Sequence, residues 1–172
     1  MEWKTRLTGL LGCKYPILQG AYARLGDWKF AGAVSKAGAE GCLTASTSRT
    51  PDKLREDIRR CRDASDGNPF SVNLSVGFCP HIDEMLEVAL EEGVHTIETA
   101  AYNGDKYGRR AKEAGAKWIH KTATIKHALH AEEQGADAVI IVDLEGIGFK
   151  NVSQLPTMTT TTWAVKQLKV PL

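Results

Sequence analysis

The sequence predicts an α/β fold: an incomplete (β/α)8 TIM barrel, in which residues 1–172 form a single domain of about six βα units. Short apolar runs alternate with amphipathic helical stretches along the chain, as in parallel βα proteins. Gly93, Gly115 and Gly135 follow predicted helices at a spacing of about 20 residues, the length of a compact strand–helix unit. A complete barrel needs about 250 residues, so we expect roughly 80 to be absent.

The predicted elements alternate regularly. The predicted strands are residues 16–19, 40–43, 70–74, 96–99, 118–121 and 138–142, and residues 170–172 would begin a seventh. The predicted helices begin at a cap near Asp27 and at Thr50-Pro51, and then cover residues 82–92, 107–114, 125–134 and 160–168. A doubly wound open sheet also tolerates six unclosed strands. Because residues 19–22 do not form its glycine-rich phosphate loop, we favour the barrel.

Composition excludes several classes of protein. The formal net charge of +1 gives no electrostatic argument for binding nucleic acid or an anionic membrane. No apolar run approaches the roughly 18 residues that a membrane span requires, and the N-terminus has no apolar stretch typical of a signal peptide. The four cysteines lack CxxC spacing, which is typical of reduced thiols. We therefore expect a cytoplasmic protein without a metal site, and homo-oligomerisation is left open.

Candidate functional residues lie where predicted strands end, because both parallel architectures place their chemistry there. They are Gln19-Gly20-Ala21, Asn73, Glu98-Thr99, Lys121-Thr122 and the segment from Asp143 to Phe149. Each also has a structural interpretation: Gly20 as a tight turn, Asn73 as a partner of backbone groups, and Lys121 as a partner of a carboxylate. Lys121 is the most informative, because lysine is rarely buried unpaired and a cation in the barrel mouth suits a phosphate or a reduced flavin.

The histidines are expected to be structural. His120 should point away from Lys121 because side chains alternate along a strand, and we interpret it as a packed, hydrogen-bonded histidine. His127 and His130 are three residues apart on a predicted helix, without the carboxylates that would complete a metal site, so a surface pair is the better interpretation.

The sequence resembles the nitronate monooxygenase (2-nitropropane dioxygenase) family of FMN-dependent TIM barrels over nearly its whole length. The matching segments are Thr5-Arg6-Leu7-Thr8, Tyr15-Pro16-Ile17-Leu18-Gln19-Gly20, the helix from Ala31 to Gly38, Pro69-Phe70-Ser71-Val72-Asn73-Leu74, Ile119-His120-Lys121-Thr122, Gly135-Ala136-Asp137-Ala138-Val139 and Glu145-Gly146-Ile147-Gly148-Phe149-Lys150-Asn151. Their combination in this order is specific, although each segment alone is weak.

The resemblance implies an FMN site and a substrate. It implies that the flavin is contacted by residues in four segments: Gln19, Gly20 and Ala21, then Asn73, Lys121, and finally Asp143 with Ile147. It further implies oxidation of a small-molecule alkyl nitronate with O2. Two alternatives remain open: an NAD(P)H-dependent flavin reductase of quinones or enoyl thioesters, and an inactive half-barrel fragment.

Two departures from the family pattern affect the expected chemistry. Phe149 occupies the position at which many relatives carry a histidine, so no catalytic base can be assigned for deprotonating a neutral nitroalkane. A nitronate is already deprotonated and does not need that base. The family also holds the FMN phosphate with glycine-rich loops after strands seven and eight, which this chain lacks. We therefore expect weak or absent FMN binding by this polypeptide alone, unless a second chain completes the site.

Overall fold

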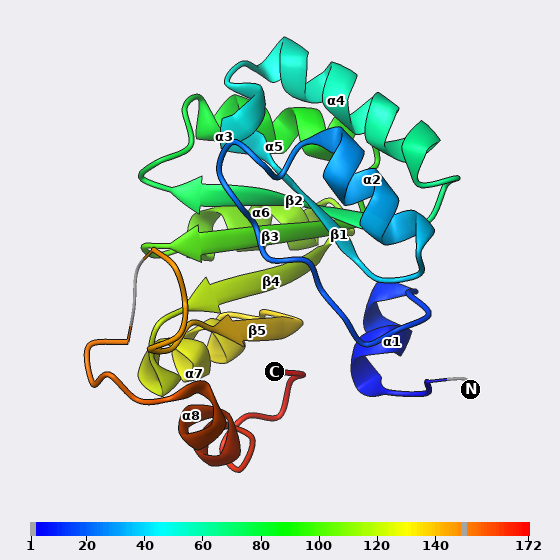
Figure 1. Ribbon diagram of the computed structural model, residues 1–172. Coiled ribbons are helices and arrows are strands. Elements are labelled where there is room, and N and C mark those ends of the chain that lie inside the picture. The colour runs from blue at the N-terminus through cyan, green and yellow to red at the C-terminus, as the bar shows by residue number, and fades with distance from the viewer. Residues whose placement is uncertain (1–2, 149–150) are drawn as a thin grey trace.

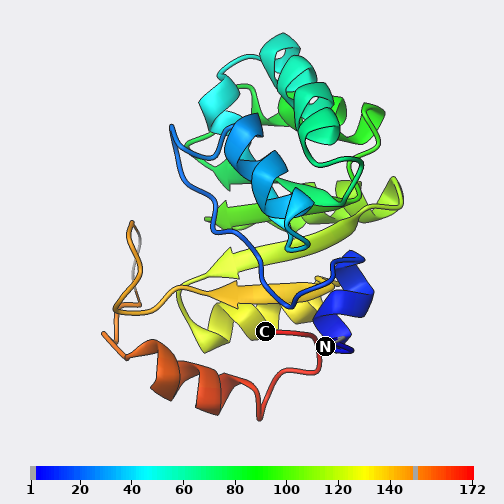
Figure 2. The same cartoon turned by 45° about the vertical axis from the view of Figure 1, so that its right-hand side comes forward.

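The computed structural model describes residues 3–148 and 151–172, and its centre is a parallel sheet of five strands (Figure 1). The strands are β1 (Gly41–Thr44), β2 (Phe70–Val76), β3 (Thr96–Ala101), β4 (Lys117–Thr122) and β5 (Ala138–Ile141), and they follow one another in chain order across the sheet. Because every neighbouring pair is parallel, all five carboxyl ends lie at one edge. The segment after β5 runs beside that edge in both ribbon views (Figures 1 and 2).

Helices before, between and after the strands cover the outer face of the sheet. They are α2 (Trp28–Lys36), α4 (Pro51–Ala64), α5 (Ile82–Glu91), α6 (Asp105–Glu113), α7 (Ile125–Glu133) and α8 (Thr157–Ala164). The predicted caps are confirmed: Asp27 accepts hydrogen bonds from the first turn of α2, and Thr50 from that of α4. Gly93, Gly115 and Gly135 all have positive φ, which explains the repeated glycine after each helix.

Two short helices were not predicted. The first, α1 (Arg6–Leu11), begins at a capping box formed by Thr5 and Thr8. It packs its apolar side chains against Ile119 and Ala138, on the inner face of the sheet. The second, α3 (Ala45–Ser48), follows β1 directly. The inner face is therefore closed by α1 at the end opposite the strand carboxyl termini.

The expected first strand, residues 16–19, is reduced to one parallel bridge between Leu18 and Glu40. Backbone hydrogen bonds join Gln19 N to Glu40 O and Glu40 N to Ile17 O, both at 2.9 Å. Pro16 has no N–H to extend this pairing. Residues 170–172 likewise form no strand, but Val139 N donates to Pro171 O at 3.0 Å beside β5. Both segments thus lie where the barrel pattern requires, while five strands form instead of six.

Apolar packing stabilises both layers. The larger core lies between β1–β3 and helices α2, α4 and α5, with Leu54, Ile58 and Met85 fully buried. A second core joins β4 and β5 to α7 and α8 around the buried Trp118. Within the described ranges, no helix is both long and apolar enough to cross a lipid bilayer.

Candidate functional site

A buried polar cluster lies on the inner face of the sheet, near the strand carboxyl ends. Asn73 pairs in register with Glu98, and Lys121 pairs with Ala100 two residues further along β3, so alternation places all three polar side chains on one face. Oε1 of Glu98 accepts a hydrogen bond from Nδ2 of Asn73 at 2.8 Å and lies 3.1 Å from Nζ of Lys121. Glu98 is fully buried, whereas the Lys121 side chain keeps 14% of its surface exposed.

Further contacts hold this cluster in place. Sγ of Cys42 lies 3.6 Å from Oε2 of Glu98. Burial, together with the charge of Glu98, raises the pKa of Cys42 well above its usual value, so the thiol stays protonated and donates to the carboxylate. The hydroxyl of Ser75 donates to Oδ1 of Asn73 at 3.0 Å. Asn73 is therefore fixed at both ends of its amide.

Glu98 is the central residue, although the sequence interpretation named it only as a strand-end residue and assigned it no contact with a ligand. The structural interpretation of Lys121, pairing with a carboxylate, is confirmed. Pairing with Glu98 is compatible with a ligand contact by Lys121, because the ion pair holds Nζ at the partly exposed end of the cluster. The sequence carried one signal for the role of Glu98, namely a glutamate inside an otherwise buried strand. An ionised carboxylate is seldom buried without a partner, so a cation beside it was to be expected.

The loop after residue 18 reaches the same edge of the sheet. The side-chain amide of Gln19 is fully engaged with the Cys42 backbone, donating to its carbonyl at 3.1 Å and accepting from its N–H at 3.2 Å. This side chain therefore extends the pairing with β1. Gly20 is exposed, and a Cβ atom there would meet nothing within 4 Å. Ala21, next to it, is half-buried.

The segment after β5 places its candidate residues differently. Asp143 is buried; its Oδ1 accepts a hydrogen bond from Asn151 at 3.4 Å, and its Oδ2 has no partner. Ile147 is 82% exposed. In the part of the chain that the structure describes, no hydrogen bond or ion pair joins either residue to the Glu98 cluster. Phe149 lies outside the described residues.

His120 faces the opposite side of β4, as alternation predicts. Its Nδ1 lies 2.7 Å from Oγ1 of Thr99, which also accepts a hydrogen bond from Nε1 of Trp118. Burial lowers the pKa of His120 to about 4, so the imidazole is neutral at physiological pH. His127 and His130 are exposed on α7, and Nε2 of His130 also pairs with Asp105 at 2.8 Å. Among the described side chains, no group of three or more His, Cys, Asp or Glu residues could hold a metal ion.

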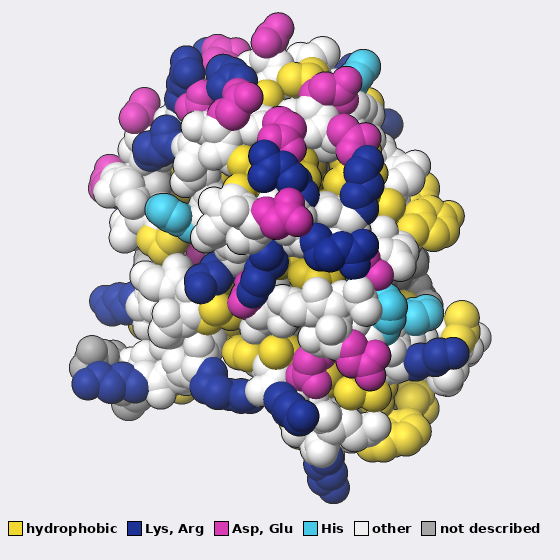
Figure 3. Space-filling model, turned by 180° about the vertical axis from the view of Figure 1, so that it is seen from behind, with side chains coloured by type: hydrophobic (Ala, Val, Ile, Leu, Met, Phe, Trp, Pro, Cys, Tyr) yellow, Lys and Arg dark blue, Asp and Glu magenta, His cyan; other side chains and the backbone are white. Residues whose placement is uncertain are grey.

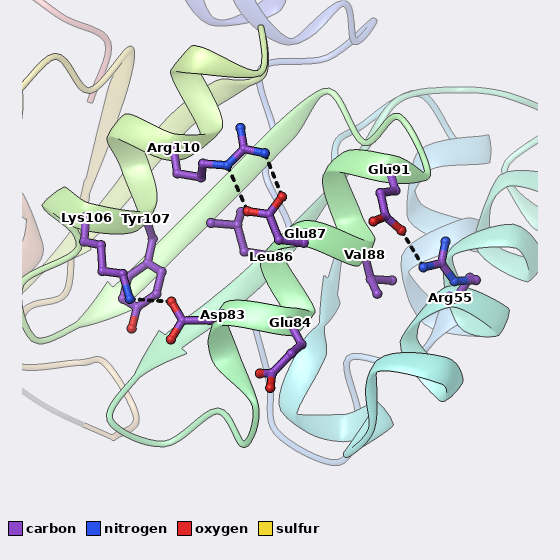
Figure 4. Close-up of a pocket in the computed structure, with 10 residues that line it drawn as sticks. All are labelled: Arg55, Asp83, Glu84, Leu86, Glu87, Val88, Glu91, Lys106, Tyr107 and Arg110. Carbon is purple, nitrogen blue, oxygen red and sulfur yellow. Dashed lines mark hydrogen bonds and ion pairs between the residues drawn. The ribbon is translucent and has the colours of Figure 1, made fainter.

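A hollow of about 690 Å³ lies away from the strand ends, between the outer surfaces of α4, α5 and α6 (Figure 4). Six of the seven charged side chains that line it pair with one another across the helices: Lys106 with Asp83, Arg110 with Glu87 and Arg55 with Glu91. The seventh, Glu84, is exposed. Figure 3 shows basic and acidic side chains interleaved over this outer face. These pairs account for all but one of the charges without a ligand, so we interpret the hollow as a helix-packing groove.

Comparison with known proteins identifies the family. The family model for nitronate monooxygenase matches residues 4–171. The chain belongs to this family. Its predicted fold class, an α/β portion of a TIM barrel, is thereby confirmed.

The known proteins to which it is similar differ in name, and the chain covers only part of each of the three that follow. The chain is 32% identical, over 86% of its length, to a hydroxy-methyl-oxo-octahydro-indene-carboxyl-CoA dehydrogenase of Mycobacterium tuberculosis, and covers 41% of that protein. It is 26% identical to a probable nitronate monooxygenase of Staphylococcus saprophyticus, with coverage of 100% of this chain and 60% of that one. The solved structure of FabK from Thermotoga maritima matches with 35% identity and a TM-score of 0.88, over 98% of this chain and 53% of FabK. The chain thus spans about half the length of these relatives.

Proposed function

We propose that this chain carries the flavin-ring side of the active site of an FMN-dependent oxidoreductase that oxidises alkyl nitronates with O2. The observation that carries the proposal is the Asn73–Glu98–Lys121 cluster, which fixes a lysine ammonium at the carboxyl ends of the strands. An ammonium in this position stabilises negative charge on a reduced ring or on a bound anion. Family membership supports the choice of a flavin.

The described residues fit such a ring system in three respects. Nζ of Lys121 belongs to a side chain that is still partly exposed, so it can pair with Glu98 and contact a ligand as well. Gly20 leaves open space where a side chain would otherwise stand, so a flat ring can approach its backbone. Oδ2 of Asp143 is buried without a partner and can accept a hydrogen bond from a ring N–H. Ala21, Asn73, Ile147 and the backbone of Gln19 complete the proposed contacts.

The proposed chemistry divides between the cofactor and the chain. Bound FMN would supply the electron transfer from nitronate to O2. Lys121 holds positive charge beside the ring, and Asn73 and Glu98 keep that charge in place. The substrate is proposed to be a nitronate rather than a nitroalkane because Phe149, at the position of the family histidine, cannot accept a proton.

Flavin fluorescence tests this proposal directly. The chain is titrated with riboflavin and, separately, with FMN; because the proposed contacts are to the ring, we expect the two Kd values to agree within about threefold, a difference below 1 kcal/mol. Lys121→Met should weaken both by about tenfold. Lys117→Met, at the opposite end of the same strand, is the matched control and should leave them unchanged. A Kd for FMN more than about tenfold below that for riboflavin, or equal effects of the two substitutions, would contradict the proposal.

A second candidate is an NAD(P)H-dependent flavin reductase acting on a quinone or an enoyl thioester. It is favoured by the 32% identical relative, whose name describes a carboxyl-CoA dehydrogenase. Anaerobic mixing of the flavin-loaded protein with either propyl nitronate or NADPH separates the two. Flavin bleaching by the nitronate alone supports the monooxygenase, and bleaching by NADPH alone supports the reductase. If neither reagent bleaches the bound flavin, the remaining alternative is an inactive half-barrel.

A further inference from the structure

A pocket of about 720 Å³ lies on the other side of β4, between the loop after β3 and helix α7. Its volume falls in the range of about 300–1,000 Å³ that is typical of small-molecule sites. The residues that line it are Ala101, Tyr102, Asn103, Asp105, His120, Lys126, His127, Leu129, His130 and Glu133. Figure 3 shows histidine side chains gathered beside hydrophobic ones at one edge of the molecule.

One wall of this pocket is an aromatic ring held in a defined position. Tyr102 stacks on Phe78, with ring centroids 5.9 Å apart, although 65% and 67% of these two residues are exposed. The residue before each ring has a positive φ. Ala101 has a φ of +76°, and Gly77 has a φ of +80°, where a Cβ atom would lie 2.8 Å from Cδ2 of Tyr102. Positive φ at a non-glycine residue is energetically costly and is concentrated at functional sites.

At its inner end, the pocket is bounded by the imidazole of His120. Nε1 of Trp118 donates to Oγ1 of Thr99, and the hydroxyl proton of Thr99 can be donated to Nδ1 of His120, which lies 2.7 Å away. A neutral imidazole that accepts at Nδ1 carries its proton on Nε2. His120 lines the pocket while only 6% of its surface is exposed. In this tautomer the pocket has a neutral hydrogen-bond donor at its inner end.

The charged side chains around the pocket are either partnered or at its rim. Asp105 is paired with His130 and also accepts a hydrogen bond from Asn103. Lys126 and Glu133 contribute one charge of each sign at the exposed rim. A charged ligand would therefore meet no unpaired opposite charge inside the pocket. A flat, apolar ligand with an oxygen acceptor would meet the hydrogen-bond donor at its inner end.

We propose that this pocket binds a planar conjugated carbonyl compound, with its ring against Tyr102 and its carbonyl oxygen accepting the hydrogen bond from Nε2 of His120. This site is separate from the Lys121 side of β4, so binding does not depend on the proposed flavin function.

The test is an NMR titration of the 172-residue chain with acetophenone, followed at the indole N–H of Trp118, which is assigned with a Trp118→Phe variant. Thr99 connects this indole to His120, so a ligand on the imidazole should shift its resonance. His120→Asn keeps an amide near Thr99 but removes Nε2, and Tyr102→Ala removes the ring wall. Each substitution should weaken binding by about tenfold. His95→Asn, at an exposed histidine outside the pocket, is the control and should change nothing.

Two further probes separate the two parts of the proposal. Cyclohexanone keeps the carbonyl but lacks the planar ring, and benzoate has the ring with a negative charge; both should bind more weakly than acetophenone. A saturable shift with this order supports the proposal. Absence of a saturable shift, tighter binding of benzoate, or acetophenone affinities that neither His120→Asn nor Tyr102→Ala changes would overturn it. Because Tyr102 is exposed, its substitution remains informative even if His120→Asn fails to fold.

Discussion

Replacing Lys121 with methionine should destabilise the protein strongly, because it leaves a carboxylate buried without its cation. Glu98 is fully buried, and its Oε1 lies 3.1 Å from Nζ of Lys121. At an effective dielectric constant of about 20, two charges at this distance attract by about 5 kcal/mol. The substitution also removes the cost of desolvating the lysine ammonium, which offsets part of this energy. We therefore expect the free energy of unfolding to fall by about 3 kcal/mol, near the lower end for breaking a buried pair.

Urea denaturation measures this loss, and thermal unfolding should show a fall in Tm of about 6–12 °C. Glu98→Gln should cost less, about 1–2 kcal/mol, because glutamine still accepts from Asn73 and the freed lysine end reaches solvent. The double variant Glu98→Gln/Lys121→Met buries no charge, so it should be more stable than the sum of the single losses predicts. The control Lys117→Met should stay within about 0.5 kcal/mol of the parent. A Lys121→Met loss as small as this control's, or simple additivity in the double variant, would refute the reasoning.

Three further substitutions test other parts of the fold. Glu40→Gln should flatten the pH dependence of stability. Burial raises the pKa of Glu40 from 4.5 to about 8, so the folded parent binds a proton and loses up to about 5 kcal/mol of stability as pH rises through this interval. Urea unfolding at several pH values checks this, and an unchanged dependence of stability on pH in the variant would contradict it. Gly108→Ala should lower the free energy of unfolding by about 2 kcal/mol, measured by thermal unfolding, because its Cβ would lie 2.1 Å from the Trp118 ring. Gly9→Ala is the control, since a Cβ atom there would meet nothing within 4 Å. Equal effects of the two substitutions would be inconsistent with this packing. Thr50→Ala should cost about 1 kcal/mol in the same assay through loss of the α4 cap, and an unchanged midpoint would argue against that cap.

The sequence predicted best those elements whose boundaries depend on local chemistry. Asp27 and Thr50 cap α2 and α4 in the structure because a side-chain oxygen followed by free N–H groups is sufficient to begin a helix. The helix α1 was missed because it is only six residues long and carries threonine, rather than glutamate or glutamine, at the third position of its capping box. The strand expected at residues 16–19 did not form because its pairing stops at one bridge: Pro16 has no N–H, and only Leu18 has a bridge partner.

The candidate site shows the same limit. Alternation along β4 was enough to predict that Lys121 points inward and His120 outward. It could not reveal that Lys121 meets Glu98, because that contact depends on the register between β3 and β4. Nor could it reveal that the amide of Gln19 is consumed by the backbone of Cys42. Contacts that depend on sheet register and on loop conformation require coordinates.

The two proposed sites share strand β4, and this arrangement makes them separable by experiment. Lys121 faces the inner cluster, whereas His120, its neighbour, faces the α7 pocket. A substitution that acts only through its own side chain should therefore affect one ligand. Lys121→Met should weaken riboflavin binding and leave acetophenone binding within about twofold, well below 1 kcal/mol, and His120→Asn should do the reverse. If either variant weakened both ligands equally, the cause would be displacement of β4 itself, and neither residue could be assigned a ligand contact from these data.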